Sequence, residues 1–293
     1  MSPILELRQL TKVYARVAAV ESIDFTLLKG EVHALLGENG AGKSTLTKMI
    51  AGVVSPTSGT IVLDGKDITL RTPSDALAAG IAMVFQETSL VPSMTVAQNL
   101  FLGNEHFFNR VRGINIAAQQ FMQSLSFQVD PTVQVGSLGA AKKQMVEIAR
   151  AMLLKARIIV FDEPTATLTP EEKRHFFELV NTLRERGVSV IFISHALEEA
   201  LSISDRITIL RDGKLVLTDK TANFDRARIV QAMVGRTLSQ ELYGTRKTSV
   251  RPAGRRVLSV SNLRVGNVVK NNSLSVFAGQ ITGIFGLVGS GRT

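Results

Sequence analysis

The chain has 293 residues, 45% of them hydrophobic, a formal net charge of +9 and no cysteine. This length can hold one large domain plus a fragment or two modest domains, the missing cysteines exclude disulfides and thiolate metal sites, and no apolar run approaches the length of about 18 residues that a membrane helix needs. The N-terminus lacks the basic region and apolar stretch of a signal peptide, so we expect a soluble, cytoplasmic protein whose charge suits an anionic partner such as a nucleotide, a nucleic acid or a membrane surface.

Short apolar strands alternate with helical patterns, which predicts an α/β fold with a mainly parallel sheet and crossover helices. The first strands have hairpin-like spacing and are expected at Ile4–Leu10, Ser22–Leu28 and Thr60–Leu63. Further buried strands are expected at Glu31–Leu36, Ile81–Phe85, Arg157–Phe161, Val188–Ile193 and Arg206–Leu210. Helices are expected at Lys43–Ile50 and, between a Pro170 start and a Gly187 stop, at Glu171–Arg186. Residues from about 88 to 150 are mostly helical and suggest an inserted helical subdomain.

A glycine-rich segment between the expected strand Glu31–Leu36 and the expected helix Lys43–Ile50 has the pattern G-x-x-x-x-G-K-[ST]. Its residues are Gly37, Glu38, Asn39, Gly40, Ala41, Gly42, Lys43 and Ser44, followed by Thr45. Such a loop turns successive backbone N–H groups inward around phosphate oxygens, Lys43 reaches the β- and γ-phosphates, and the Ser44 hydroxyl helps to hold Mg²⁺. A plain glycine-rich turn is the alternative, but a strand before the loop and a helix after it are the context that a phosphate loop requires.

Two acidic residues end a strongly apolar strand further along the chain. Asp162 and Glu163 follow Ile158-Ile159-Val160-Phe161. A carboxylate at a buried strand tip suits a contact with Mg²⁺, which favours oxygen ligands. Glu163 would then face the γ-phosphate and orient or activate the attacking water. Strands often end in acidic residues, and it is the upstream phosphate loop that favours the functional interpretation.

Composition changes after Arg236, so we expect a first domain at residues 1–236 and a linker at 237–256. Thr245–Arg256 carries five basic residues among small and breaker residues, with no apolar periodicity. Residues 257–293 then repeat the opening of the chain as strand, strand, strand and phosphate loop, the last at Gly286–Thr293. Four glycine pairs lie 249 positions apart, namely Gly30/Gly279, Gly37/Gly286, Gly40/Gly289 and Gly42/Gly291. We expect a truncated start of a second domain here, with uncovered strands that favour aggregation.

The order and spacing of these motifs resemble the nucleotide-binding subunits of ABC transporters. More narrowly, the chain is similar to the double-cassette ATPases of bacterial monosaccharide importers of the ribose, xylose, galactose and arabinose type. The segments that carry the resemblance are Gly37–Thr45, Gln86, Val135–Ala149, Asp162–Thr169, Phe192–Glu199 and Met233–Arg236. The resemblance implies a P-loop NTPase of ABC type, with a mainly parallel core sheet, an antiparallel β subdomain and an inserted helical subdomain.

The resemblance also assigns roles to single residues. Tyr14 matches the aromatic residue that stacks on adenine, although an ordinary half-buried tyrosine at a strand end is the alternative. Gln86 matches the residue that contacts Mg²⁺ and the membrane partner, and His195 matches the switch histidine that contacts the γ-phosphate. Ala166–Thr169 resembles the loop that crosses the dimer interface. The implied ligands are ATP and Mg²⁺, with Glu163, His195 and Lys43 catalytic and Ser44, Gln86 and Asp162 at the metal.

One motif departs from the family pattern. The signature Leu-Ser-x-Gly-Gln corresponds here to Leu138-Gly139-Ala140-Ala141-Lys142, which lacks the serine hydroxyl and places a Cβ where the family has glycine. In the family the signature of one cassette faces the phosphate loop of the other. The altered signature therefore serves the second loop, where Arg292 replaces lysine with a bulkier, planar cation. We hypothesise one hydrolytic site and one weak site.

Three functions compete at this stage. The first is an ATPase subunit that energises sugar import at the cytoplasmic face of the inner membrane, with a membrane-spanning permease, a second cassette and, indirectly, a sugar-binding protein as partners. The second is a soluble ABC-type ATPase acting on ribosomes or nucleic acid, which the short, breaker-rich linker disfavours, so no nucleic acid is expected. The third is a remnant that binds ATP without turnover. We expect the chain by itself to bind ATP and to hydrolyse little; the sequence does not name the sugar.

Overall fold

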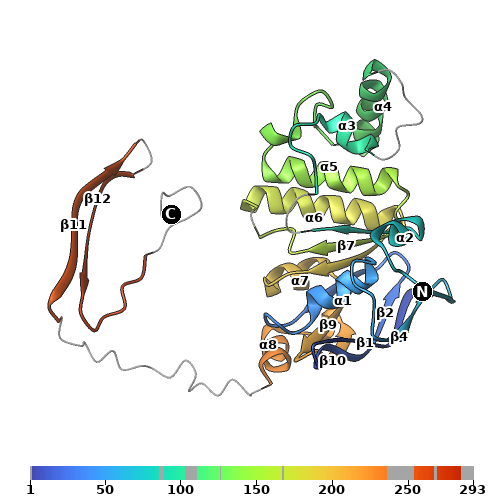
Figure 1. The fold of residues 1–293 in the computed structure, drawn as a ribbon, viewed down its shortest axis with the longest axis horizontal. Helices are drawn as coiled ribbons and strands as arrows, with labels where there is room; N and C mark the ends of the chain where they lie inside the picture. Colours follow the sequence, from blue (N-terminus) through green and yellow to red (C-terminus); the bar gives the residue numbers. More distant parts are fainter. Residues whose placement is uncertain are drawn as a thin grey trace. The chain divides into compact units, whose positions relative to one another are not determined.

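The computed structural model describes residues 2–85, 89–102, 111–125, 127–166, 168–235, 254–266 and 269–284. The chain separates into two compact units, Met1–Thr237 and Leu238–Thr293, each of which is described by itself. Figure 1 shows the larger first unit with its sheets and covering helices and the second unit as a two-stranded ribbon. Among the described residues, no helix is long and apolar enough to cross a membrane.

Two sheets form the frame of the first unit. A six-stranded sheet has the order β10-β9-β3-β8-β7-β6, in which β9, β3, β8, β7 and β6 run parallel and β10 is an antiparallel edge. A four-stranded antiparallel sheet has the order β2-β1-β4-β5. The strands are β1 Pro3–Tyr14, β2 Val17–Leu28, β3 Val32–Leu36, β4 Ser58–Leu63, β5 Lys66–Ile68, β6 Ile81–Val84, β7 Ile158–Asp162, β8 Ser189–Ile193, β9 Arg206–Arg211 and β10 Lys214–Lys220. The predicted parallel core sheet and antiparallel subdomain are confirmed.

Helices cover the parallel sheet and build a separate layer beyond it. In Figure 1, α3 and α4 lie above α5 at the end of the unit remote from the antiparallel sheet, and this is the helical insertion expected from the sequence. The helices are α1 Lys43–Ile50, α2 Pro73–Ala78, α3 Val96–Phe101, α4 Val111–Ser124, α5 Ala140–Leu153, α6 Pro170–Glu185, α7 Leu197–Ile203 and α8 Arg226–Val234, with 3₁₀ turns η2 Val135–Ser137 and η3 Thr221–Asn223.

The strands of the parallel sheet are buried on both faces, as their continuous apolar runs predict. In β7, Ile159 and Phe161 join the core below α5 and α6, whereas Ile158 and Val160 join the core shared with α1 and the antiparallel sheet. This alternation with a period of two residues leaves no polar face at the sheet centre. The ends of these strands are consequently held rigidly, and the side chains that follow them are the ones available for chemistry.

Local sequence determines where α6 begins. The Thr169 side chain caps the helix by accepting a hydrogen bond from the backbone N–H of Glu172, the Glu172 carboxylate accepts one from the backbone N–H of Thr169, and Pro170 occupies the first turn. Such a reciprocal cap satisfies two N–H groups that the first turn leaves unpaired. The expected start at Pro170 therefore agrees with the structure.

The described residues of the second unit form one hairpin of β11, Arg256–Val265, and β12, Val269–Phe277. Its pairing repeats that of β1 and β2: Leu258↔Val276, Val260↔Leu274 and Leu263↔Asn272 match Leu5↔Leu27, Leu7↔Phe25 and Leu10↔Ile23. The irregularity in each first strand is also shared. Gln9 and Asn262 both have positive φ, at 48° and 54°, and each donates its backbone N–H over 2.9 Å to a side-chain oxygen of the facing strand. The internal repeat is thus visible in the backbone.

The third strand expected in the second copy does not form in the described residues. Its counterpart β3 lies between β8 and β9 and takes its hydrogen bonds from both. In the described part of the second unit no such neighbours are present, residues 281–284 have no strand structure, and the Ile281 side chain is 99% exposed. A strand without a partner leaves its backbone groups unpaired, so the apolar pattern alone was insufficient. Most of the expected linker and the second phosphate loop lie outside the described residues.

Candidate functional site

The glycine-rich segment forms a tight connection between β3 and α1. Gly40 and Gly42 have φ of 84° and 99°, a region that residues with a side chain rarely adopt. A Cβ on Gly42 would also lie 2.5 Å from the carbonyl oxygen of Ala19. Glycine at position 42 is therefore required twice over, by backbone conformation and by the close approach of β2.

Lys43 folds back over this loop. Its Nζ donates hydrogen bonds to the carbonyl oxygens of Gly37, at 2.7 Å, and Glu38, at 3.0 Å, and the residue is only 5% exposed. Burial lowers the pKa of Lys43, while the charges of Glu163 and Asp162 oppose that shift. The ammonium group is accordingly a nearly desolvated cation held in the loop, where an anion would be attracted strongly.

The amino end of α1 completes a site suited to anions. No side chain caps this end of the helix, whose N-cap is Gly42, and the neighbouring Ser44 is exposed. The first N–H groups of a helix lack partners within it, and the helix dipole places positive potential there. With Lys43 beside it, the end of α1 fits phosphate oxygens.

Two carboxylates and a histidine follow the neighbouring strands. Asp162 is the last residue of β7, and Glu163 comes next with a φ of 51°, which is unusual for a residue with a side chain. His195 follows β8 by two positions, and its Nε2 lies 2.5 Å from Glu163 Oε1. Burial raises the pKa of Asp162, the adjacent charge of Glu163 adds to this, and Lys48, Lys43 and His195 oppose it.

The sheet register brings these groups to one edge. Ile193 at the end of β8 pairs with Leu35 near the end of β3 on one side and with Asp162 at the end of β7 on the other. Three parallel strands therefore end at the same level, and the phosphate-type loop, Glu163 and His195 all follow that level. The sequence named these residues as candidates, and the strand order β3-β8-β7 brings them to this edge.

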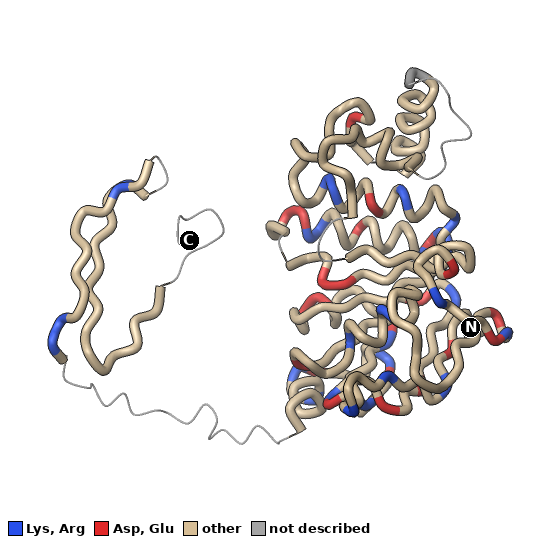
Figure 2. The backbone as a smooth tube through the Cα atoms, viewed as in Figure 1, with Lys and Arg blue, Asp and Glu red and all other residues tan. Residues whose placement is uncertain are grey.

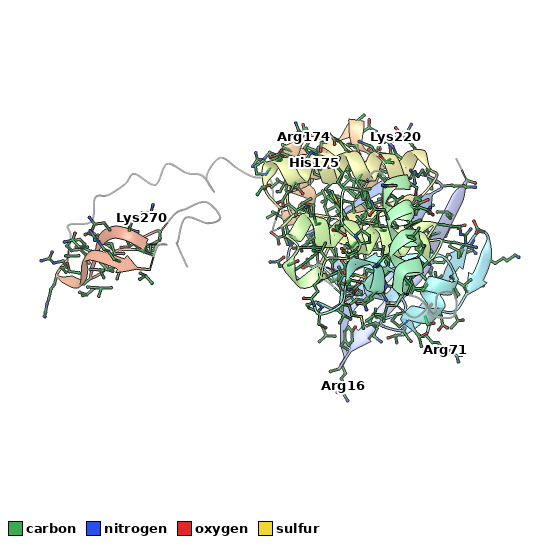
Figure 3. All side chains as sticks on the ribbon, turned by 90° about the horizontal axis from the view of Figure 1, so that it is seen from above. Arg16, Arg71, Arg174, His175, Lys220 and Lys270 are labelled. Carbon is green, nitrogen blue, oxygen red and sulfur yellow. The ribbon has the colours of Figure 1, made fainter. Side chains whose placement is uncertain are left out.

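The remaining predicted residues are placed less centrally. Tyr14 ends β1, is 46% exposed, and has Lys12 Nζ 5.2 Å from its ring centre. The turn that follows carries Arg16, which projects away from the body of the unit in Figure 3. The exposed ring remains compatible with both stacking on a base and an ordinary strand end. Gln86 and Thr167 lie outside the described residues.

The altered signature segment forms the start of α5. Gly139 is the N-cap, without a capping side chain, and a Cβ added to it would meet nothing within 4 Å. Ala141 is partly buried and packs against the core under the helical layer. A serine at position 139 is therefore sterically allowed, so a steric clash does not explain why this chain lacks it.

Sequence reasoning missed a buried carboxylate behind this site. Glu199 in α7 is 8% exposed and accepts hydrogen bonds from Thr165, Ser194 and Lys173. The neighbouring Glu198 has a side chain that is 70% exposed. The sequence signal for its burial is helical spacing: Glu199 lies four positions before the buried Ile203, on the same inward face of the helix.

Comparisons with known sequences agree with the geometry. The sequence model of the ABC transporter family matches residues 20–166. Ribose import ATP-binding protein RbsA 1 of Rubrobacter xylanophilus is 45% identical over 296 residues, covering 100% of this chain and 58% of the relative. RbsA 2 of Escherichia coli O157:H7 is 42% identical over 295 residues, covering 100% and 58%. The chain thus spans somewhat more than half the length of these curated relatives.

Solved structures show the same fold. An ATP-binding cassette of an ABC transporter in its ADP conformation has a TM-score of 0.70 and 24% identity, and the match covers 80% of this chain and 100% of that one. A nucleotide-free cassette from an ABC transporter has a TM-score of 0.69 and 23% identity, with 83% and 99% covered. At these identities the similarity establishes the architecture, and the chemistry has to be argued from the residues of this chain.

Proposed function

The chain belongs to the ABC transporter family, and we propose that it is an ATP-binding and ATP-hydrolysing subunit that energises monosaccharide import across a bacterial inner membrane. The observation that supports this best is the common edge of β3, β8 and β7. There Lys43 and the uncapped end of α1 lie within electrostatic reach of Asp162 and Glu163. A triphosphate and its reacting water both find their partners at such an edge.

Binding of the phosphates falls to the loop between Gly37 and Thr45. Lys43 releases the two carbonyl oxygens that it now contacts and donates instead to β- and γ-phosphate oxygens. The N–H groups at the start of α1 donate to the same anion. The nucleobase would lie against Tyr14, whose ring is exposed and carries Lys12 nearby.

The residues present fit Mg²⁺ at the β- and γ-phosphates. Ser44 is exposed and offers a hydroxyl, and Asp162 is a carboxylate whose pKa is raised by burial and by the adjacent charge of Glu163, both of which a bound cation would offset. Oxygen donors of this kind suit Mg²⁺, which neutralises charge that develops on the phosphates. Gln86 is our third candidate for this metal.

Glu163 is the residue that we assign to the attacking water. Its carboxylate is in contact with His195 Nε2, so its orientation is determined by a side chain from a different strand. A carboxylate held in this way would accept a hydrogen bond from water in line with the γ-phosphate and take its proton as the bond from the water oxygen to the γ-phosphorus forms and the bond from that phosphorus to the leaving ADP oxygen breaks. The family resemblance also assigns His195 to the γ-phosphate, which would couple its position to the nucleotide.

We propose further that the site is completed by a second cassette. The segment Leu138–Lys142 stands where the family has its signature, and it offers neither the serine hydroxyl nor the glycine of that motif. In the family such a segment pairs with the phosphate loop of another cassette, and the second loop in this sequence has Arg292 where lysine is expected. The outcome is one hydrolytic site, built on Lys43, and one weak site.

A membrane-spanning permease is the proposed partner at the cytoplasmic face of the membrane. An apolar pocket is lined by Leu77, Phe85 and Leu154, and Phe85 directly precedes in sequence Gln86, the residue that the family resemblance assigns to the permease contact. The relatives named as ribose import proteins make ribose the first sugar to test. The sugar itself would be selected by the permease and a sugar-binding protein.

Two other functions receive less support. An ATPase acting on nucleic acid would be favoured by a basic face, but in the view of Figure 2 Lys and Arg alternate with Asp and Glu over the first unit. Residues 236–256 hold six Lys or Arg and one Glu, so they supply +5 of the net +9. A non-hydrolysing remnant would bind ATP without turnover, and the following experiment separates it from the proposal.

The test compares Glu163→Gln with Glu171→Gln, an exposed carboxylate in the first turn of α6. In single-turnover measurements, which detect the slow hydrolysis expected of this chain by itself, we expect Glu163→Gln to bind ATP with unchanged affinity and to lower the rate by about 10²-fold or more, whereas Glu171→Gln behaves as the wild type. Equal hydrolysis by all three chains would contradict the assignment. Grafting Leu-Ser-Val-Gly-Gln onto residues 138–142 should raise turnover only where a second phosphate loop is present.

A further inference from the structure

Three separate segments converge on one buried carboxylate, that of Glu199. Its Oε2 accepts hydrogen bonds from Thr165 Oγ1, at 2.5 Å, and from Ser194 Oγ, at 2.8 Å. Its Oε1 accepts one from Lys173 Nζ, at 2.7 Å. The Glu199 side chain is 9% exposed, so these three donors replace the water that a carboxylate normally requires.

The donors lie next to the chemical site. Thr165 follows Glu163 by two positions, and Ser194 directly precedes His195. Ser194 also accepts a hydrogen bond from the backbone of Ala196, so the turn around His195 is held from both sides. Glu199 therefore connects the two segments whose side chains meet in the Glu163–His195 contact.

The contact between Glu163 and His195 needs support from other residues. The backbone of Glu163 has a φ of 51°, a conformation that costs about 1 kcal/mol or more for a residue with a side chain and persists where the surroundings enforce it. His195 stands on an irregular segment between β8 and α7, with a side chain that is 46% exposed. Neither residue is fixed by burial alone.

The charge of Glu199 is what makes it an effective anchor. Burial by itself would raise the pKa of Glu199, but the hydrogen bonds from Lys173, Thr165 and Ser194 together hold it below its ordinary value. Glu199 therefore remains ionised at neutral pH, and charge-assisted hydrogen bonds are stronger than neutral ones. Removing the carboxylate would leave two hydroxyls and an ammonium group without their partner.

We propose that Glu199 is a positioning residue that sets the distance and orientation between Glu163 and His195. The proposal rests on the hydrolytic role assigned above to those two residues. Glu199 acts through Thr165 and Ser194 and does not itself reach the nucleotide. Lys173 ties the same carboxylate to α6, so the position of this helix is transmitted to the site.

The chain provides a matched control in Glu198. It belongs to the same helix and carries the same charge, but its side chain is 70% exposed and pairs only with Arg226, at 3.3 Å, among the interactions of the described residues. Replacing it changes the net charge equally and leaves the three hydrogen bonds of Glu199 in place.

The experiment uses the full 293-residue chain as wild type, Glu199→Ala, Glu199→Gln and Glu198→Ala. Single-turnover hydrolysis, with chain in excess over ATP, gives the rate constant and the half-saturating concentration separately. NMR spectra of the histidine rings, assigned with His195→Gln, report the surroundings of His195 without ATP. We expect Glu199→Ala to lower the rate constant by about tenfold or more, to change ATP affinity less than about twofold, and to shift the His195 ring signals.

Glu199→Gln keeps an oxygen acceptor for Thr165 and Ser194 and loses only the ion pair, so it should recover part of the rate and the His195 signals. Glu198→Ala should match the wild type in both measurements. The proposal is overturned if folded Glu199→Ala or Glu199→Gln merely melts earlier while the His195 signals and the rate stay at wild-type values. If the wild-type chain binds no ATP, the proposed function fails by itself, and the ring signals still decide whether Glu199 positions His195.

Discussion

The two hairpins of this chain have the same pairing and very different surroundings. In β1–β2, Leu5 and Leu10 are fully buried in the core shared with α1. In β11–β12, the matching Leu258 and Leu263 are 52% and 43% exposed. Register and bulge are therefore properties of the hairpin sequence itself, whereas burial is supplied by the rest of a cassette.

The comparison separates what forms locally from what makes a site. A two-stranded hairpin is at best marginally stable by itself. The first unit adds the parallel sheet, and only with that sheet do the ends of β3, β8 and β7 reach one edge. The proposed site therefore depends on the non-local strands and not on the repeated opening.

The largest expected difference concerns the cores of the two hairpins. Leu5→Ala removes a buried side chain and should lower the free energy of unfolding of the first unit by about 2–5 kcal/mol. Leu258→Ala, at the matching exposed position, should change it by no more than about 0.5 kcal/mol. Denaturant unfolding followed by circular dichroism measures both. Equal losses would mean that the second hairpin contributes to the same core, and the comparison would fail.

The second prediction concerns the two phosphate loops. Lys43 is enclosed by the carbonyl oxygens of Gly37 and Glu38, so the planar guanidinium of Lys43→Arg should not fit and should weaken ATP binding by about tenfold or more. Arg292→Lys should leave the affinity of this site unchanged. Titration calorimetry compares the two variants. Unchanged affinity in Lys43→Arg would show that the loops are more alike than their sequences indicate.

A smaller effect is expected at the shared bulge. Asp24→Ala removes the acceptor of the Gln9 backbone N–H, and Ser273→Ala removes that of Asn262. Each hydrogen bond is worth about 1 kcal/mol. Hydrogen exchange should therefore speed up at Gln9 in the first variant, whereas exchange at Asn262 should already be fast in the wild type. Equally slow exchange at both amides would show that the second hairpin is as stable as the first.

The smallest difference is a dependence on pH that only the first copy should show. His33 in β3 is fully buried, its Nδ1 lies 3.2 Å from Glu31 Oε1, and the second copy has Thr282 at the matching position. Burial lowers the pKa of His33, which the charges of Glu31 and Asp205 oppose and that of Arg206 reinforces.

The unfolded chain therefore binds a proton on His33 before the folded chain does. Stability should be complete above the ordinary histidine pKa of about 6.5 and should fall as the pH drops below it, towards the lower pKa of the folded state. Thermal unfolding between about pH 5 and pH 7 measures the slope. His33→Thr should reduce it, and an identical slope in that variant would assign the effect to other groups.

Much of the fold followed from the sequence because its signals are local. Lys43–Ile50 forms the predicted helix, and the capped start of α6 lies at Pro170 as expected. The first two strands are longer than predicted, reaching Tyr14 and starting at Val17, because their ends pair with each other beyond the apolar pattern. The third strand predicted in the second copy does not form in the described residues, because none of them pairs with it.

The candidate residues of the proposed site could be named from the sequence, whereas the buried carboxylate of Glu199 behind them could not. Lys43, Asp162, Glu163 and His195 stand in recognisable contexts at strand ends, and the structure brings them to one edge. Glu199 was not found, because in sequence it differs from Glu198 only by one position on a helical turn. Its three donors come from segments that only the tertiary fold brings together.

The most direct test of the account is the number of nucleotides that the chain binds. Titration calorimetry with ATP and Mg²⁺ should give one nucleotide per chain for the wild type and none for Lys43→Ala, because the loop beside Asp162 and Glu163 is the one that we propose to bind the triphosphate. The far-UV circular dichroism of both chains should be the same, which separates lost binding from lost folding. Equal binding by folded Lys43→Ala and wild type would contradict the account.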